Sequence, residues 1–246
     1  MSVRANIDCL QWESDFFGLS TAKLDFTATQ AEIILASQLD DYVITQAKIA
    51  AHDIERLDGL SQLGFSLVEG EVDFALTIGI ENAYLNNGLL ATDRVEAAVA
   101  SDIPVLRQAA EQVFSQSRFR APWYREGDSG RFYALWIEKA VLGTFDHTCL
   151  LVKEASGAIL GFVSLRHLDD DTARIGLLAV MPRANGRGIG RKLMSAAWVW
   201  CEQHKKRQVN VATQISNIAA LNLYSRSGAV IASTAYWLYR GQHDSI

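Results

Sequence analysis

The clearest run of apolar residues in the chain lies at residues 174–180, where nearly every position is apolar or small. This pattern is typical of a strand buried on both faces. Pro182 ends the strand, because proline cannot donate to a ladder. From Ile189 on, apolar residues recur at helical spacing, which predicts a helix with one buried stripe. The stripe consists of Ile189, Leu193, Ala196, Ala197, Trp200 and Cys201.

The rest of the second half of the chain alternates helices and short strands. Residues 103–114 have the periodicity of an amphipathic helix, and Pro104 suits its first turn. A second helix is expected around residues 132–141, and a last one begins at Asn217. Strands are expected at residues 149–152, 159–165, 174–180 and 209–213, followed by the last strands within 229–240. The crossover rule makes the strands at 174–180 and 209–213 parallel.

The first half is less regular. Residues 44–63 carry helical periodicity, and Gly64 can stop that helix before a new strand at 68–76. Alternation in this strand places Glu69, Glu71 and Asp73 on one face. Residues 79–94 lack periodicity and predict a linker. We therefore expect a smaller α/β domain at residues 1–90 and a larger α/β domain at 91–246, with a mixed central sheet and flanking helices.

Three glycines follow the buried strand at the start of the predicted helix, at positions 186, 188 and 190. Without Cβ atoms in the way, several unpaired N–H groups can converge there on one anion. A Walker loop is excluded, because Gly190 is followed by Arg191, Lys192 and Leu193 and no magnesium-binding hydroxyl is present. The spacing also differs from a Rossmann fingerprint. A tight turn that uses glycine for geometry alone is the remaining alternative.

Composition narrows the function classes. The chain has 246 residues and 49% apolar content, which is enough for one large core or two smaller ones. No segment has the length of a membrane span and the start lacks a signal peptide, so we expect a cytoplasmic protein. Cys9, Cys149 and Cys201 are scattered and are expected to be reduced thiols without a metal. The net charge of -5 argues against binding to nucleic acid.

The motif from Val180-x-Pro182 through Gly186-x-Gly188-x-Gly190-Arg191-x-Leu193 resembles the acetyl-CoA signature of the GCN5-related N-acetyltransferases. Asn185 departs from it, since the family usually has Arg or Gln there. The resemblance implies that family's fold, with the N-terminal domain as a truncated copy, and acetyl-CoA as co-substrate. The implied contacts to acetyl-CoA come from Leu178, Ala179, Val180, Asn185, Gly186, Arg187, Gly188, Ile189, Gly190, Arg191 and Asn217.

Residues 117–124 interleave arginines with aromatic side chains. Arg118 can pair with a phosphate and Trp123 can stack on a planar base. Anchoring of a long loop explains the same residues equally well. Segments at 12–18, 46–50, 63–73, 117–124 and 233–240 resemble the acetyltransferases that modify dTDP-linked amino sugars. This wider resemblance implies acetylation of the 4-amino group of a dTDP-linked 4-amino-4,6-dideoxy-galactose in the synthesis of enterobacterial common antigen.

Two other functions compete with this one. A protein N-terminal or lysine acetyltransferase would have an acidic acceptor groove, whereas the arginines at 118, 120 and 131 favour an anionic acceptor. A non-catalytic acyl-CoA-binding module would not need the tyrosine described next. Acyl chain length and oligomeric state, including a homodimer, are left open by the sequence.

The expected chemistry is direct attack of a neutral amine on the thioester. Tyr224, in the position implied by the family's Asn-x-x-Ala-x-x-x-Tyr order, can protonate the leaving thiolate, since a tyrosine is protonated at neutral pH. Glu69 is the candidate base, and the choice of Glu69 over Glu71 and Asp73 rests on the resemblance. Cys149 and Cys201 are rejected as nucleophiles because they lie on apolar elements.

Overall fold

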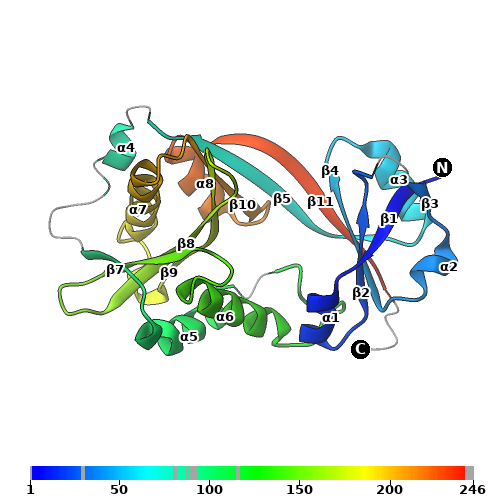
Figure 1. The fold of residues 1–246 in the computed structure, drawn as a ribbon, viewed down its shortest axis with the longest axis horizontal. Helices are drawn as coiled ribbons and strands as arrows, with labels where there is room; N and C mark the ends of the chain where they lie inside the picture. The colour runs from blue at the N-terminus through cyan, green and yellow to red at the C-terminus, as the bar shows by residue number, and fades with distance from the viewer. Residues whose placement is uncertain are drawn as a thin grey trace. The chain divides into compact units, whose positions relative to one another are not determined.

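The computed structural model describes residues 2–28, 31–79, 82–86, 88, 94–114 and 117–241 (Figure 1). Contacts divide the chain into two compact units, which we describe separately. Unit 1 comprises Met1–Glu71, Gln116–Ser129 and Ser233–Ile246. Unit 2 comprises Val72–Ser115 and Gly130–Ala232.

Unit 1 is a sheet with short helices. Its strand order is β3-β1-β2-β4-β11-β5, in which β2 and β4 are parallel and β4 and β11 are antiparallel. Its elements are β1 (Arg4–Cys9), α1 (Gln11–Phe17), β2 (Thr21–Asp25), β3 (Glu32–Ile33), α2 (Ala36–Leu39), β4 (Ile44–Ala50), α3 (Ile54–Gln62), the first part of β5 (Ser66–Thr77) and most of β11 (Val230–Gly241).

The two faces of this sheet differ in character. One face is an apolar core in which Leu24, Ala47 and Leu238 pack with Leu60 of α3 and with Phe65. The alternate positions of the same strands, such as Lys23, Gln46 and Trp237, point to the opposite face because strand side chains alternate. Polar and aromatic side chains therefore collect on one side of unit 1.

The predicted helix over residues 44–63 is wrong in its first third. Ile44–Ala50 forms β4, which pairs with β2 on one side and β11 on the other. The helix begins only at Ile54, where the Asp53 side chain caps it by accepting from the Arg56 amide at 3.1 Å. Strand neighbours distant in the sequence thus override the local periodicity.

Unit 2 is built on the strands β5-β10-β9-β8-β7-β6, hydrogen-bonded in that order. Its elements are the second part of β5, α4 (Ala83–Asn86), β6 (Arg94–Ala97), a 3₁₀ turn at Ala100–Asp102, α5 (Ile103–Val113), α6 (Asp128–Val141, from Gly130 on), β7 (Thr148–Lys153), β8 (Ile159–His167), β9 (Thr172–Val180), a 3₁₀ turn at Pro182–Ala184, α7 (Ile189–Gln203), β10 (Gln208–Gln214) and α8 (Ile218–Arg226).

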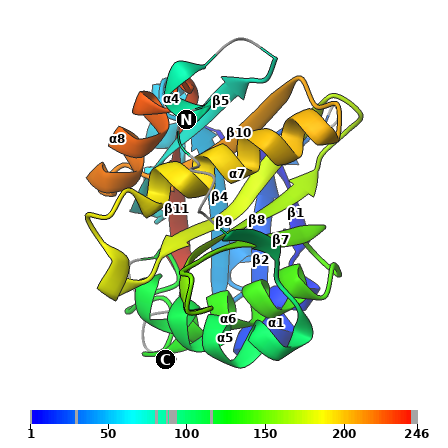
Figure 2. The same cartoon turned by 90° about the vertical axis from the view of Figure 1, so that its left-hand side faces the viewer.

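Helices cover both faces of this sheet, as Figure 2 shows for α7 on one side and α5 and α6 on the other. A Cβ at Gly161 of β8 would lie 3.0 Å from the Leu193 side chain, so α7 packs directly on the backbone there. The next residue, Phe162, points the other way and its ring lies 6.4 Å from that of Phe114, at the end of α5. The sheet is thus buried on both faces, as the run of apolar residues at 174–180 predicted.

The predicted helices and strands of the second half are confirmed, including the parallel pairing of β9 with β10. The last predicted strands are one long strand, β11. The expected boundary near residue 90 does not coincide with the division into units, because β5 and β11 each contribute to both. The predicted linker contains α4 and residues outside the described ranges. In the described ranges, no helix has the length and hydropathy of a membrane span.

Candidate active site

The glycine loop between β9 and α7 presents a row of unused backbone donors. Gly186 and Gly188 have φ angles of 75° and 74°, in the left-handed region where a side chain is strained. The amides of Gly186, Gly188, Ile189 and Gly190 donate to no described residue. They lie at the start of α7, a helix of 15 residues whose positive dipole end adds to the attraction of an anion. The loop has the chemistry of a diphosphate cradle.

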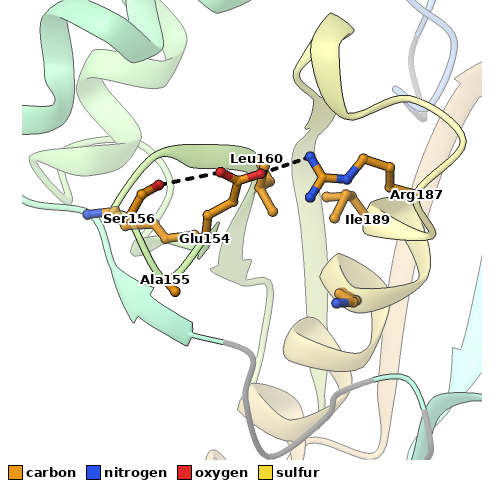
Figure 3. A pocket seen from close by; sticks show the side chains of 8 residues that line it. Glu154, Ala155, Ser156, Leu160, Arg187 and Ile189 are labelled. Atoms are coloured by element: carbon orange, nitrogen blue, oxygen red, sulfur yellow. Dashed lines mark hydrogen bonds and ion pairs between the residues drawn. The ribbon is translucent and has the colours of Figure 1, made fainter.

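An open pocket lies beside this loop (Figure 3). Arg187 crosses its edge and donates from Nη1 to Glu154 Oε1 at 2.9 Å, and this contact lowers the pKa of Glu154. Lys153 and Lys192 also line the pocket, so three cations and one carboxylate contribute to its lining. The sequence analysis missed Lys153 and Glu154, since only the folded hairpin of β7 and β8 brings them to a loop 33 residues away.

The two central strands of unit 2 separate beside the loop. β10 pairs with β9 from Gln208 to Val211, opposite Thr172 to Ile175, and the pairing stops there. β9 continues to Val180 with its other edge bonded to β8. The edge of residues 176–180 that faces β10 is therefore open to an extended ligand. This edge includes Leu178, Ala179 and Val180, whose contacts to acetyl-CoA remain a prediction.

Three other predicted cofactor residues have structural partners in the described chain. Arg191 donates from Nε to the Tyr84 carbonyl at 2.8 Å and stacks on the Tyr84 ring, so its guanidinium is occupied by α4. Asn217 caps α8 by accepting from the Ala220 amide at 3.1 Å. Asn185 is exposed at the end of the 3₁₀ turn. Their contributions to acetyl-CoA binding remain predictions.

Tyr224 lies on α8 and is almost fully buried in unit 2. Its ring contacts Phe74 edge to face at 5.6 Å, and no described residue hydrogen-bonds to its hydroxyl. The adjacent Leu223 packs on Gly190, where a Cβ would lie only 3.1 Å from the leucine side chain. Gly190 therefore lets α8 approach the first turn of α7. Burial raises the pKa of Tyr224 above its usual value, so the hydroxyl stays protonated.

The cysteines have no features of nucleophiles. Cys149 and Cys201 are buried, and desolvation raises the pKa of both, that of Cys201 to about 12. A buried thiol of this kind is the unreactive protonated form at neutral pH. Among the described residues, no cluster of His, Cys, Asp or Glu side chains could hold a metal ion.

The three carboxylates of β5 have different surroundings. Glu71 accepts from Lys48 and from Trp237 Nε1, the latter at 3.0 Å. Asp73 pairs with Arg174 at 2.9 Å. Among the described residues Glu69 accepts only from the Gly70 amide, at 2.9 Å, and desolvation raises its pKa. Of the three, Glu69 is the carboxylate that is not neutralised by a direct ion pair and is shifted toward a higher pKa.

Arg118 is held by a network inside unit 1. Its Nη1 donates to Gln46 Oε1 at 2.8 Å and to the Tyr239 hydroxyl, while Gln46 in turn donates to Glu13 and to Tyr124. The guanidinium carbon lies 4.0 Å from the Trp237 ring centre and 4.1 Å from that of Phe119. Its Nε and Nη2 have no hydrogen-bond partner in the described chain. Arg118 is thus fixed in position with donors to spare.

Trp123 does not offer the stacking surface that the sequence suggested. It is only 5% exposed, and it packs edge to face on Tyr239 at 5.5 Å and against Gly241. A nucleotide base cannot stack on a ring whose faces are already covered. The alternative interpretation, an aromatic anchor for the loop, describes this residue.

A sequence profile described as "Acetyltransferase (GNAT) family" matches residues 109–229. A dTDP-fucosamine acetyltransferase of Escherichia coli O6:H1 is 51% identical over 240 residues, which are 98% of this chain and 100% of that protein. Among solved structures, a GCN5-related N-acetyltransferase from Sphaerobacter thermophilus aligns with a TM-score of 0.60 at 19% identity, covering 80% of this chain and 59% of that one. A conserved protein of unknown function from Staphylococcus epidermidis aligns with a TM-score of 0.64 at 15% identity, covering 97% and 91%.

Proposed function

The chain belongs to the acetyltransferase (GNAT) family, and from that premise we propose that it transfers the acetyl group of acetyl-CoA to the 4-amino group of a dTDP-linked 4-amino-4,6-dideoxy-galactose. The observation that supports this choice of acceptor is the 51% identity to a dTDP-fucosamine acetyltransferase along nearly the whole chain. Enterobacterial common antigen synthesis is the pathway that we propose for the product.

The acetyl-CoA half of the proposal is supported within unit 2. The four unused amides of the glycine loop suit the diphosphate of CoA, and the open edge of β9 suits the amides of its pantetheine arm. A backbone N–H on that edge can polarise the thioester carbonyl as negative charge develops on its oxygen. The cations that line the neighbouring pocket complement further phosphate charge.

The reaction that we propose has no acyl-enzyme intermediate. The neutral amine attacks the thioester carbonyl carbon, a C–N bond forms, and the C–S bond breaks with its electron pair on sulfur. Glu69 takes the proton that the sugar ammonium must lose before attack, and Tyr224 gives its proton to the thiolate. The nitrogen loses its second proton to solvent as the amide forms, and a proton from solvent restores the Tyr224 hydroxyl. The raised pKa values of both groups suit these roles. Glu69 belongs to unit 1 and Tyr224 to unit 2, and the contacts that support each role lie within the residue's own unit.

A protein acetyltransferase is less well supported as an alternative. Its acceptor surface would need carboxylates for a basic peptide. In unit 1 Arg118 instead has unused donors, while Glu71 and Glu13 are both engaged by other side chains. Three free cysteines support the prediction of a reducing, cytoplasmic location.

The deciding experiment supplies the purified protein with acetyl-CoA and a panel of acceptors, and follows thiol release. The panel contains dTDP-linked 4-amino sugars, the corresponding UDP-linked sugars and peptides with a free N-terminus or lysine. We expect turnover with the dTDP-linked amino sugar and a product heavier by one acetyl group. Turnover of peptides alone would replace the proposal with protein acetylation.

A further inference from the structure

Three cations of unit 1 converge on one indole ring. Arg118 lies 4.0 Å from the ring centre of Trp237, and the Nζ atoms of Lys23 and Lys48 each lie 5.6 Å from it. We infer that this group, called the Trp237 cluster from here on, binds the diphosphate of the nucleotide-sugar acceptor. The inference rests on the proposed function and assigns Lys23 and Arg118 as the residues that recognise the acceptor's charge.

The cluster is built by strand alternation and not by chance proximity of surface side chains. Lys23 comes from β2, Lys48 from β4 and Trp237 from β11, which are consecutive strands of the sheet. Lys48 is directly opposite Trp237 in the antiparallel register of β4 and β11. All three side chains point away from the apolar core, because Leu24, Ala47 and Leu238 at the alternate positions belong to it.

The carboxylates around the cluster are already occupied. Glu71 accepts from Lys48 and from Trp237, Glu13 accepts from Gln46, and Asp25 accepts from the amide and hydroxyl of Thr27. Lys23, by contrast, forms no hydrogen bond or ion pair with a described residue. The ammonium of Lys23 and the outer edge of Arg118 are therefore the donors that the folded chain leaves for a ligand.

A diphosphate fits what these donors require. The guanidinium offers two N–H groups in a fixed plane that match the oxygens of one phosphate, and a lysine ammonium suits the next as a point charge. Glu71 balances the charge of Lys48, whereas Lys23 and Arg118 have no ion pair with a described residue, so the two together favour a ligand with more than one negative charge. The diphosphate of CoA has a separate cradle on the glycine loop of unit 2, which leaves the acceptor's diphosphate for unit 1.

The same face of unit 1 carries the proposed base. Glu69 and Glu71 are two residues apart on β5 and share a face of the strand, and Glu71 contacts Trp237 directly. An acceptor whose diphosphate lies on the Trp237 cluster would thus extend its amino sugar along the face on which Glu69 stands. Recognition of the nucleotide and removal of the ammonium proton are therefore functions of one sheet surface.

The test uses Lys23→Gln in the 246-residue chain, since Lys23 forms no hydrogen bond or ion pair with a described residue. Arg56→Gln is the matched control, because Arg56 is a cation of unit 1 that stacks on Phe26 at 4.6 Å, among the residues of the opposite, apolar face. Calorimetry measures the binding of dTDP and of thymidine, which lacks the diphosphate. Steady-state kinetics measures the KM of both substrates.

We expect Lys23→Gln to weaken dTDP binding and to raise the acceptor KM by about tenfold, with the acetyl-CoA KM within about twofold of the wild-type value. Thymidine binding and the Arg56→Gln variant should be unaffected, and Lys23→Arg should restore most of the dTDP affinity. Unchanged dTDP binding in a folded Lys23→Gln variant would overturn the inference even if the sugar is acetylated. Loss of dTDP binding in the Lys23→Gln variant would support the inference. Failure of the wild-type protein to acetylate the sugar would refute the proposed function and would leave this binding result standing.

Discussion

At the scale of single residues, Tyr224 is placed where a hydroxyl can act only as an acid. It is buried, it has no hydrogen-bond partner in the described chain, and burial holds its pKa above the usual value. A hydroxyl with these properties is protonated at neutral pH and is therefore available as a proton donor.

Replacement of Tyr224 by Phe keeps the contact with Phe74 and removes only the hydroxyl. We expect kcat to fall by about 10²-fold, as is typical for loss of a general acid. The melting temperature should barely change, because no hydrogen bond is lost. Initial-rate assays measure kcat, and thermal unfolding measures the melting temperature. A fall in kcat below about threefold would exclude the acid role.

Glu69 should control the acid side of the pH profile. A base must be ionised, and desolvation raises the pKa of Glu69 above 4.5, so the acid limb of kcat/KM should lie above the range of an ordinary glutamate. Glu69→Gln should remove that limb and lower kcat. Rates measured from pH 5 to 9, about the range accessible to folded protein, would show both effects.

Stability provides the control for this variant. A carboxyl whose folded pKa is raised stabilises the fold when protonated at low pH, and this contribution is lost as the pH rises through the folded pKa. At neutral pH the ionised Glu69 is therefore slightly unfavourable, and Glu69→Gln should leave the melting temperature unchanged or raise it. A lower melting temperature at neutral pH would show that Glu69 has a structural role instead.

The sequence could name the three carboxylates of β5 but could not choose among them from its pattern. Strand alternation places all of them on one face, whereas their partners Lys48 and Arg174 come from distant parts of the chain. Trp123 shows the same limit. From the sequence, an aromatic residue in a loop can be an exposed stacking surface or a buried anchor. The contacts of Trp123 with Tyr239 and Gly241 distinguish the two.

At the scale of elements, the unit formed by β9, the glycine loop and α7 was predicted almost completely, because strand, turn and helix each have a strong local pattern. β4 was mistaken for a helix, because the alternation of Gln46 and Lys48 with Ala47 and Ile49 is short and is followed directly by the apolar residues of α3 at helical spacing. The separation of β9 from β10 likewise depends on the register between these two strands, and the local sequence pattern does not show that register.

The glycine loop gives a prediction of its own. Gly188→Glu would place a carboxylate among the free amides and strain a residue with φ of 74°. The acetyl-CoA KM should rise by more than about tenfold while the acceptor KM changes little. Gly143→Glu, at an exposed turn with φ of 67°, is the matched control. Equal changes in both KM values would contradict the assignment of the cradle.

Arg187→Ala should have a smaller effect than Gly188→Glu in the same assay. The Arg187 side chain is 50% exposed and pairs with Glu154, so solvent screens any contact with phosphate.

At the scale of the whole molecule, neither unit is a continuous stretch of chain. Unit 1 needs β11 beside β4, and Leu238 of β11 is part of its apolar core. The sequence pointed to continuous domains because the weak periodicity at residues 79–94 resembles a linker. Pairing between β4 and β11, which are far apart in the sequence, leaves no trace in local patterns.

A fragment of residues 1–90 should therefore fail to fold by itself. It lacks β11, which makes β4 an unpaired edge and exposes the core around Ala47 and Leu60. We expect a fragment without a cooperative thermal transition and with a strong tendency to aggregate, since an exposed apolar edge strand recruits other chains. Circular dichroism and size-exclusion chromatography measure both properties. A cooperative transition in the isolated fragment would contradict this view.

The position of β11 also constrains how the protein is made. Domains usually fold from the N-terminus while the ribosome is still adding residues, but here the strand that completes the first unit, Val230–Gly241, is synthesised after most of unit 2. Most of unit 2 is translated before unit 1 can close, so the N-terminal strands must wait as a nascent chain with an open edge at β4. A premature stop shortly before residue 230 would damage the beginning of the protein more than the part next to the stop.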